Sequence, residues 1–206
     1  MNQTRTRTRV APSRPAGTLL ALLCASVLAF SAHSLRAAPA EEPSTQVLSD
    51  SLTYDDIKKE SVFTGNVLLT RGDMTLHADT LTVRQLPDGT QQGEARANKG
   101  KLVRIRQDRP ETFEAVEGTA QRAEYDDRKG EFDLVGQAVV IRYVCGKPFD
   151  TIRGERVRYN EKNNTYQAQG GANSSAADGR VRSVVEPRAK ADAAAAACRN
   201  NPAQKK

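Results

Sequence analysis

The 206-residue sequence has no tryptophan and contains only five phenylalanines, five tyrosines and two histidines. So few aromatic side chains allow one lean hydrophobic core but disfavour the thick, multilayered core of a large enzyme. His77 is the only histidine after the N-terminal segment, and no serine or cysteine motif surrounds it. It therefore lacks the positioned partner that catalysis requires and the additional ligands of a metal site. We expect no catalytic residues, no metal and no cofactor.

Acidic residues are absent from the first 40 residues, which carry five arginines. Residues 16–32 are almost entirely apolar or small. A basic start followed by a short apolar stretch and small residues is typical of a secretory signal peptide. Ala38-Pro39-Ala40 places small residues at both positions that signal peptidase reads, so we expect a signal peptide over residues 1–40. Ala32-His33-Ser34 is a second candidate cleavage site.

A retained membrane anchor is the alternative interpretation of residues 16–32, but this stretch is short for a membrane span. Cleavage after Ala40 leaves 26 basic and 25 acidic residues, because the removed segment holds five of the 31 basic residues and no acidic one. A net charge of +1 gives no electrostatic footprint for nucleic acid. We therefore expect an exported protein without a nucleic-acid partner.

Cysteine is scarce as well, and only Cys145 and Cys198 lie beyond the predicted signal peptide. Disulfides persist in the compartments that exported proteins reach. The two cysteines either form a disulfide that attaches the C-terminal tail to the body of the domain, or remain free. The sequence leaves both possibilities open.

Helical periodicity is nearly absent between residues 45 and 186. Short runs of alternating apolar and polar residues, such as 62–70 and 102–106, are separated instead by turn residues, such as Arg71-Gly72-Asp73. This pattern is typical of an all-β domain.

One six-residue pattern occurs four times, starting at Ser49, Ala78, Ala120 and Gly154. It consists of a small residue, a polar residue, any residue, an apolar residue, any residue, and then Tyr or Val. A glycine follows each start by 16, 22, 16 and 16 residues, and an apparent hairpin insertion accounts for the longer spacing. Such repeats predict stacked strand units that enclose a long, narrow apolar interior. The ends of such a stack carry unpaired strand edges.

Residues 61–72, followed by Leu76-His77-Ala78-Asp79-Thr80-Leu81, resemble the opening motif of the OstA-like family, and most closely its periplasmic lipopolysaccharide-transport bridge proteins. The resemblance covers residues 46 to about 188. It implies an all-β fold, an open, twisted β-jelly roll built from stacked antiparallel strand repeats, over residues 41–188. We expect residues 189–206 to form an Ala-rich, disordered tail.

The resemblance also implies a function and partners. Family members shield the acyl chains of lipopolysaccharide, which belong to its lipid A part, in an apolar groove between the inner and outer membranes. The implied partners are the inner-membrane and outer-membrane transport components, which dock through the jelly-roll edges, and further copies of the chain in a head-to-tail oligomer. We therefore expect a transport protein and not an enzyme.

Candidate lipid contacts are apolar residues that strand alternation directs toward the interior. The resemblance aligns Ile105 and Tyr125 with lipid-facing positions of the family. The other candidates are Tyr54, Phe63, Val67, Leu69, Leu81, Val103, Phe132, Val139, Ile141, Val157 and Tyr159. The alternative is that these residues only form the core, although the two roles overlap at the open edge of a groove.

Two other functions remain open at this point. A cargo-free structural β scaffold that polymerises through its sheet edges needs no groove. A β-solenoid enzyme acting on polysaccharide needs a constellation of carboxylates or histidine on one face, and none is visible. The pairs Asp55-Asp56 and Asp126-Asp127 fall in predicted turns, where aspartate is common for conformational reasons.

Overall fold

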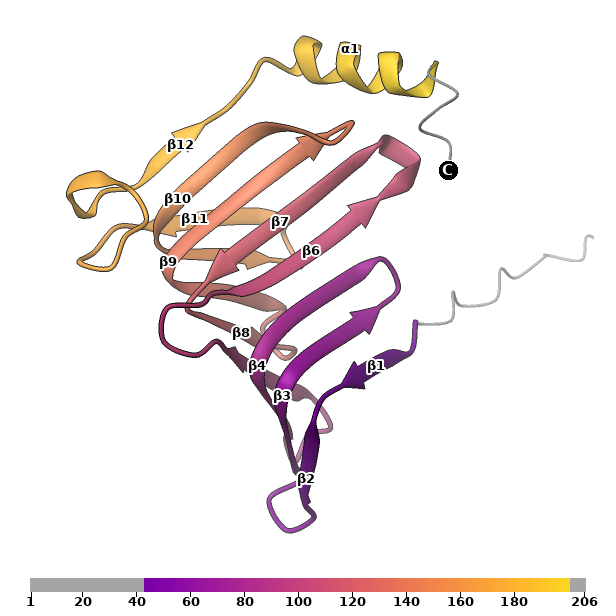
Figure 1. Ribbon diagram of the computed structural model, residues 1–206, viewed down its shortest axis with the longest axis vertical. Coiled ribbons are helices and arrows are strands. Elements are labelled where there is room, and N and C mark those ends of the chain that lie inside the picture. Colours follow the sequence, from indigo (N-terminus) through magenta and orange to yellow (C-terminus); the bar gives the residue numbers. More distant parts are fainter. Residues whose placement is uncertain (1–42, 201–206) are drawn as a thin grey trace, which may run out of the picture. The chain divides into compact units, whose positions relative to one another are not determined.

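The structure, a computed structural model, describes residues 43–200 (Figure 1). The predicted signal peptide lies outside these residues and stays a prediction. Twelve strands, two short 3-10 helices and one α-helix follow one another along the described chain. They are β1 (Thr45–Leu48), β2 (Ser51–Asp55), β3 (Glu60–Arg71), β4 (Met74–Gln85), β5 (Gln91–Arg96), β6 (Val103–Arg109), η1 (Pro110–Thr112), β7 (Glu114–Ala120), β8 (Arg122–Asp126), β9 (Glu131–Val144), β10 (Lys147–Asn160), β11 (Thr165–Gln169), η2 (Ala177–Gly179), β12 (Arg182–Val184) and α1 (Arg188–Arg199).

Four long strands, β3, β4, β9 and β10, bend near their middles, so that each contributes to two facing sheets (Figure 1). Sheet 1 has the order β2-β3-β4-β5-β8-β9-β10-β11. Sheet 2 has the order β1-β3-β4-β6-β7-β9-β10-β12. All of these pairings are antiparallel, and the predicted fold class, an open β-jelly roll, is confirmed.

Glycines with positive φ mark two of the bends, because the left-handed conformation suits a residue without a Cβ atom. Gly65 in β3 has a φ of 80° and Gly136 in β9 has a φ of 77°. A polar side chain fills the space beside each glycine: an added Cβ would lie 2.1 Å from Asp50 Oδ2 at Gly65 and 2.3 Å from Gln121 Oε1 at Gly136. The backbone N–H groups of Asp50 and Gln121 also donate to the carbonyls of these glycines, at 2.9 and 2.8 Å.

The other two copies of the repeated pattern place their polar residue at comparable corners. Asp79 accepts a hydrogen bond from the backbone N–H of Asn98 at 2.8 Å, and Glu155 accepts one from Asn173 at 3.1 Å. Each copy of the six-residue repeat therefore marks a corner at which its polar residue hydrogen-bonds a crossing segment, through its backbone N–H in two copies and through its side chain in the other two.

The strand registers align apolar residues in rows across the facing sides of the two sheets. Nearest the bends, these residues form a closed core. The buried residues of this core are Val67, Leu76, Leu81, Ala95, Val103, Ala120, Ala123, Leu134, Ala138 and Val157.

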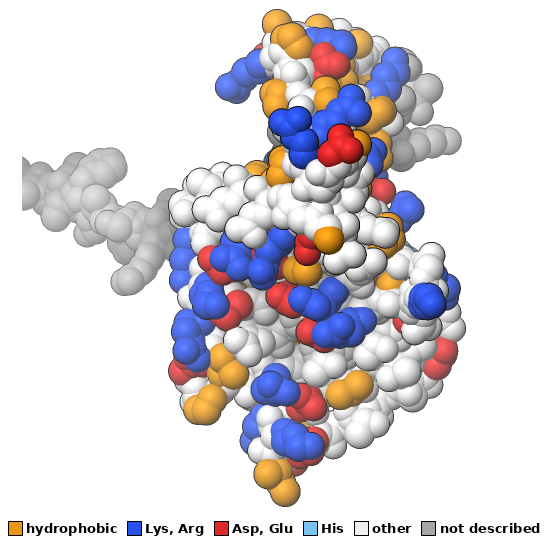
Figure 2. Space-filling model, turned by 90° about the vertical axis from the view of Figure 1, so that its left-hand side faces the viewer, with side chains coloured by type: hydrophobic (Ala, Val, Ile, Leu, Met, Phe, Trp, Pro, Cys, Tyr) orange, Lys and Arg blue, Asp and Glu red, His pale blue; other side chains and the backbone are white. Residues whose placement is uncertain are grey.

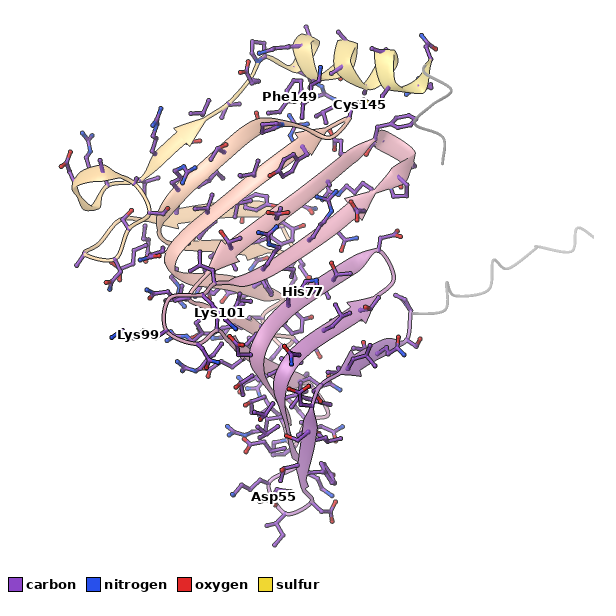
Figure 3. All side chains as sticks on the ribbon, viewed as in Figure 1. Asp55, His77, Lys99, Lys101, Cys145 and Phe149 are labelled. Atoms are coloured by element: carbon purple, nitrogen blue, oxygen red, sulfur yellow. A yellow bond between two sulfur atoms is a disulfide. The ribbon has the colours of Figure 1, made fainter. Side chains whose placement is uncertain are left out.

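The C-terminal residues differ from the expected disordered tail. Residues 188–199 form α1, which buries Ala191 and Cys198. Cys198 forms a disulfide with Cys145 at the turn between β9 and β10, and Ala191 packs with Val144 and Phe149. Cys145 and Phe149 lie beneath the helix (Figure 3). The expectation of disorder is wrong for these residues, because the alanine-rich stretch has high helix propensity and a small apolar cluster to pack on.

Candidate functional site

An apolar cavity of about 150 Å³ opens between the two sheets, and Leu134 and Val157 of the closed core form part of its wall. Sheet 1 and sheet 2 supply most of its lining, and two charged residues, Arg109 and Glu161, lie at its rim. The lining from sheet 1 comprises Phe132, Leu134, Val157, Tyr159 and Tyr166, and that from sheet 2 comprises Met74, Ile105, Gln107, Val116, Gly118 and Val140.

Gly118 sets how closely the two sheets approach beside the cavity. An added Cβ at this glycine would lie 2.6 Å from Leu134 Cδ1 on the facing sheet and 3.0 Å from Ile105 Cγ2 on the neighbouring strand. The side chain of Leu134 therefore fills the space that a larger residue at position 118 would need. The floor of the groove depends on this close contact.

The structure brings four of the predicted lipid contacts, Ile105, Phe132, Val157 and Tyr159, together in the lining of the cavity. Three other candidates, Val67, Leu81 and Val103, belong to the closed core and are 1%, 4% and 0% exposed. Phe63 and Leu69 pack against that core and are only partly buried. The candidates thus divide between a groove and the core beneath it.

Tyr125 and Tyr54 lie on the same side of sheet 1 as Phe132 but outside the cavity lining. Tyr125 pairs directly with Phe132 in the ladder between β8 and β9. Its hydroxyl lies 3.4 Å from Asp127 Oδ1, and burial, together with the carboxylates of Glu161 and Asp127, raises its pKa. Tyr54 is on the N-terminal edge strand β2 and is 56% exposed.

The prediction that Val139 and Ile141 face the interior is wrong. Their neighbour Val140 packs against the core and lines the cavity, so strand alternation directs both residues to the outer face of sheet 2. Ile141 pairs there with Glu117 and Val139 pairs with Arg153. Residues 138–141 are all apolar, so the sequence pattern alone does not distinguish the two faces of this strand.

Sequence reasoning missed several lining residues: Met74, Val116, Leu134, Val140 and Tyr166. Leu134 follows Phe132 at strand spacing, so the alternation of β9 was sufficient to find it. Tyr166 lies on β11, a strand of only five residues. Its position opposite Tyr159 becomes evident only from the register between β10 and β11. The centroids of the two tyrosine rings are 4.8 Å apart.

Ion pairs flank the cavity on sheet 2. Arg142 donates to Glu114 and Asp150, both at 2.6 Å. Burial alone would lower the pKa of Arg142, but these hydrogen bonds outweigh burial and raise it. Arg109 is only 4.0 Å from Glu114. The groove therefore has an apolar interior with charged groups at its margin.

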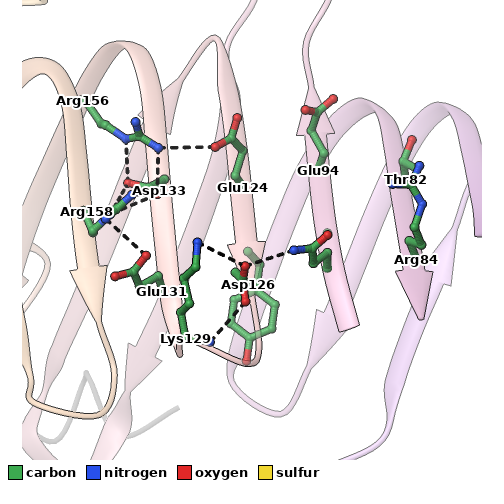
Figure 4. A pocket seen from close by; sticks show the side chains of 13 residues that line it. Thr82, Arg84, Glu94, Glu124, Asp126, Lys129, Glu131, Asp133, Arg156 and Arg158 are labelled. Atoms are coloured by element: carbon green, nitrogen blue, oxygen red, sulfur yellow. Dashed lines mark hydrogen bonds and ion pairs between the residues drawn. The ribbon is translucent and has the colours of Figure 1, made fainter. Parts of the chain in front are cut away.

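A second, polar pocket of about 370 Å³ lies on the outer face of sheet 1 (Figure 4). Its centre is Asp133, which is 5% exposed and accepts hydrogen bonds from Arg156 at 2.9 Å and from Arg158 at 2.8 Å. Burial alone would raise the pKa of Asp133, but these hydrogen bonds lower it. Glu124 and Glu131 pair with the same arginines, at 3.5 and 3.2 Å. Such cross-strand pairs stabilise a solvated sheet face.

His77 lies on the outer face of sheet 2, exposed and opposite Arg104 (Figure 3). Within residues 43–200, no group of three or more His, Cys, Asp or Glu residues is arranged to hold a metal ion. In the same part of the chain, no helix has the length and apolar character needed to cross a membrane.

The chain was compared with protein families, with solved structures and with curated proteins. The family described as LptA/(LptD N-terminal domain) LPS transport protein matches residues 46–165. Among solved structures, the chain is similar to LptH from Pseudomonas aeruginosa, described as the LptA homologous periplasmic component of the conserved lipopolysaccharide transport device. The TM-score is 0.58 at 23% sequence identity, over 70% of this chain and 96% of that chain, and this similarity supports the fold. No curated protein matches the chain.

Proposed function

This chain belongs to the LptA/LptD N-terminal domain family of lipopolysaccharide transport proteins, and we propose that it is a periplasmic bridge that carries lipopolysaccharide between the two membranes. Its groove binds the acyl chains of lipid A, and the chain performs no catalytic step. The proposal includes export by the N-terminal signal segment, with cleavage after Ala40.

The observation that carries this proposal is the apolar cavity between the two sheets. Most of its lining is aliphatic or aromatic, and its two charged residues, Arg109 and Glu161, are exposed to solvent. Burying one methylene group contributes about 0.8 kcal/mol, so an acyl chain of a dozen carbons gains roughly 10 kcal/mol by leaving water. An apolar groove with a polar margin matches a molecule that combines acyl chains with a phosphorylated sugar.

The apolar rows also reach both ends of the jelly roll. In sheet 1, one row runs from Leu52 through Leu81 and Leu134 to Ala168, following the strand registers. Its neighbour begins at Tyr54 and ends at Tyr166. Leu52, Tyr54 and Tyr166 are 56%, 56% and 43% exposed, respectively, although they belong to these inner rows. Exposed apolar side chains at both ends favour continuation of the groove into another domain.

Strand polarity favours a head-to-tail arrangement. Each sheet contains eight antiparallel segments, so its first and last strands run in opposite directions. A second copy placed in the same orientation therefore presents β1 antiparallel to β12, and β2 antiparallel to β11. We propose that copies of this chain associate by β-augmentation at these edges, and that jelly-roll domains of the inner-membrane and outer-membrane components use the same edges.

Binding of purified lipopolysaccharide to two charged variants tests the cargo. Ile105→Asp places a charge in the cavity, whereas Ile141→Asp places the same charge on the opposite face of sheet 2. We expect Ile105→Asp to weaken binding at least tenfold, since a charge left in a dry apolar site costs several kcal/mol. Ile141→Asp should bind like the unmodified protein. Equal affinities in the two variants would reject the groove as the binding site.

A further inference from the structure

Arginines at the C-terminal end of the jelly roll differ from the other arginines of the domain. Between residues 84 and 158, every arginine except Arg153 lies within 4.0 Å of a carboxylate. Basic and acidic side chains are correspondingly intermingled over the body of the domain (Figure 2). Within the described residues, no ion pair is formed by Arg153, Arg180, Arg182, Arg188 or Arg199.

Two of these arginines repel each other within the sheet. Arg153 on β10 pairs directly with Arg182 on β12, and like charges directly opposite each other destabilise a sheet. β12 has only three residues, all of them exposed. This local cost is uncompensated within the described chain, which favours an acidic partner from another molecule.

The N-terminal end of the same domain carries the complementary charge. Residues 43–60 contain four acidic residues and two lysines, and Glu41 and Glu42 precede them in the sequence. The lysines pair locally with Asp55 and Asp56, at 3.1 and 2.7 Å. Asp50 is exposed, and its side chain accepts a hydrogen bond from Asn66 Nδ2 at 2.9 Å. It forms no ion pair within the described residues.

The strand registers indicate which charges would meet. One row of sheet 2 runs straight from Val47 on β1 through Leu76 and Val140 to Ser183 on β12. When a second copy continues this row, Ser183 lies opposite its Val47. Antiparallel pairing then places Arg182 opposite Leu48, and extending the same register past the ends of β12 and β1 brings Arg180 opposite Asp50 of the next copy.

We propose that the unpaired arginines of the C-terminal edge, led by Arg180 and Arg182, recognise the acidic N-terminal edge of a second copy of this chain. The inference rests on the proposed head-to-tail association and adds that charge complementarity orients the two copies. Charge complementarity accelerates encounter and selects the correct end, whereas the backbone pairing between β12 and β1 is largely independent of sequence. Two C-terminal edges repel each other, so head-to-head pairing is disfavoured.

Sedimentation or light scattering of the full mature chain at several salt concentrations tests this proposal. Arg180→Gln/Arg182→Gln removes two charges at the proposed interface. Lys99→Gln/Arg128→Gln is the matched control, because it removes two charges from exposed loops away from both edges. Asp50→Asn removes the partner charge and keeps an oxygen that accepts from Asn66.

We expect the unmodified protein to associate more weakly as salt rises, since exposed charges are screened. Arg180→Gln/Arg182→Gln should weaken association by about three- to tenfold and flatten this salt dependence. The control should match the unmodified protein. Adding Asp50→Asn to Arg180→Gln should produce less than the sum of the two separate effects, because a coupled pair is lost only once.

Equal association of the arginine variant and the control would overturn the proposal, as would strict additivity of Asp50→Asn and Arg180→Gln. Arginine-dependent binding to vesicles of anionic lipid, with unchanged self-association, would assign the face to a membrane surface and also contradict it. Lipopolysaccharide binding by each variant distinguishes failure of the proposed function from failure of the proposed edge recognition. If the proposed function is correct, binding persists even where the edge assignment fails.

Discussion

The closed core and the groove are built from the same strands, yet they differ in how much of each side chain is left for another molecule. Val103 and Ile105 show this within one strand: Val103 is fully buried among protein side chains, whereas Ile105, two residues further along β6, lines the cavity. The fold is thus stabilised beside the bends, while the same inner face offers a ligand surface further along. Position within the sheet, more than residue type, separates structural from binding side chains.

The largest expected effect comes from placing a charge in the closed core. Val103→Asp buries a carboxylate without a partner, so we expect a loss of about 4 kcal/mol or more in the free energy of unfolding. Denaturant unfolding measures this loss. Ile105→Asp, in contrast, should lower stability far less than it weakens lipopolysaccharide binding. If both variants unfold outright, the distinction between core and groove fails.

Removing the disulfide is expected to have the next largest effect on stability. Cys145 and Cys198 are 53 residues apart in sequence, and opening a loop of this length costs about 2–4 kcal/mol. We expect Cys145→Ser/Cys198→Ser to shift the denaturation midpoint and to expose α1 to proteolysis. Lipopolysaccharide binding should be preserved, because neither cysteine lines the cavity. Loss of binding in a folded variant would place α1 in the binding site.

Gly118→Ala sharpens the boundary between the two regions. Its added methyl group meets Leu134, so the sheets must separate or the groove floor must rearrange, at a cost of about 1–3 kcal/mol. We expect altered lipopolysaccharide affinity together with this loss of stability. Gly93→Ala is the control, because an added Cβ there lies 3.8 Å from its nearest neighbour, an ordinary contact. Equal effects of the two substitutions would contradict the role of the contact between Gly118 and Leu134 in shaping the groove floor.

The smallest expected effect concerns acid stability. Hydrogen bonds from Arg156 and Arg158 lower the pKa of Asp133 in the folded chain. A lowered pKa stabilises the fold above the unfolded value of about 3.9, and this contribution disappears as the pH falls through the folded pKa. We expect Asp133→Asn to lower the free energy of unfolding at neutral pH by about 1 kcal/mol. Near pH 3, the difference in stability between Asp133→Asn and the unmodified protein should be smaller. A difference that persists unchanged at pH 3 would contradict this explanation.

The sequence predicts the fold well because short, local sequence patterns mark the corners between the two sheets. The polar residues Asp50, Asp79, Gln121 and Glu155 recur at one position of the repeat, and the structure places each beside a crossing segment. The inner positions of Phe132 and Val157 follow from alternation. Val139 and Ile141 do not, since the continuous apolar run 138–141 conceals which face is internal. Only the register, a long-range property, settles that choice.

The C-terminal region is less predictable for another reason. An Ala-rich segment either forms a helix or stays disordered, depending on whether a packing surface is available. Val144, Phe149 and Cys145 supply that surface, but their proximity to residues 188–199 arises from tertiary structure. Tyr166 was missed for a related reason, because β11 becomes part of the groove only through its pairing with β10.

Photo-crosslinking in intact cells tests the central claim most directly. A photoreactive residue at Ile105 faces the groove, and one at Ile141, on the neighbouring part of sheet 2, faces outward; Tyr125 provides a second inner position. We expect lipopolysaccharide adducts at Ile105 and Tyr125 and none above background at Ile141. Adducts of equal intensity at all three positions, or adducts only at Ile141, would contradict transport through the groove.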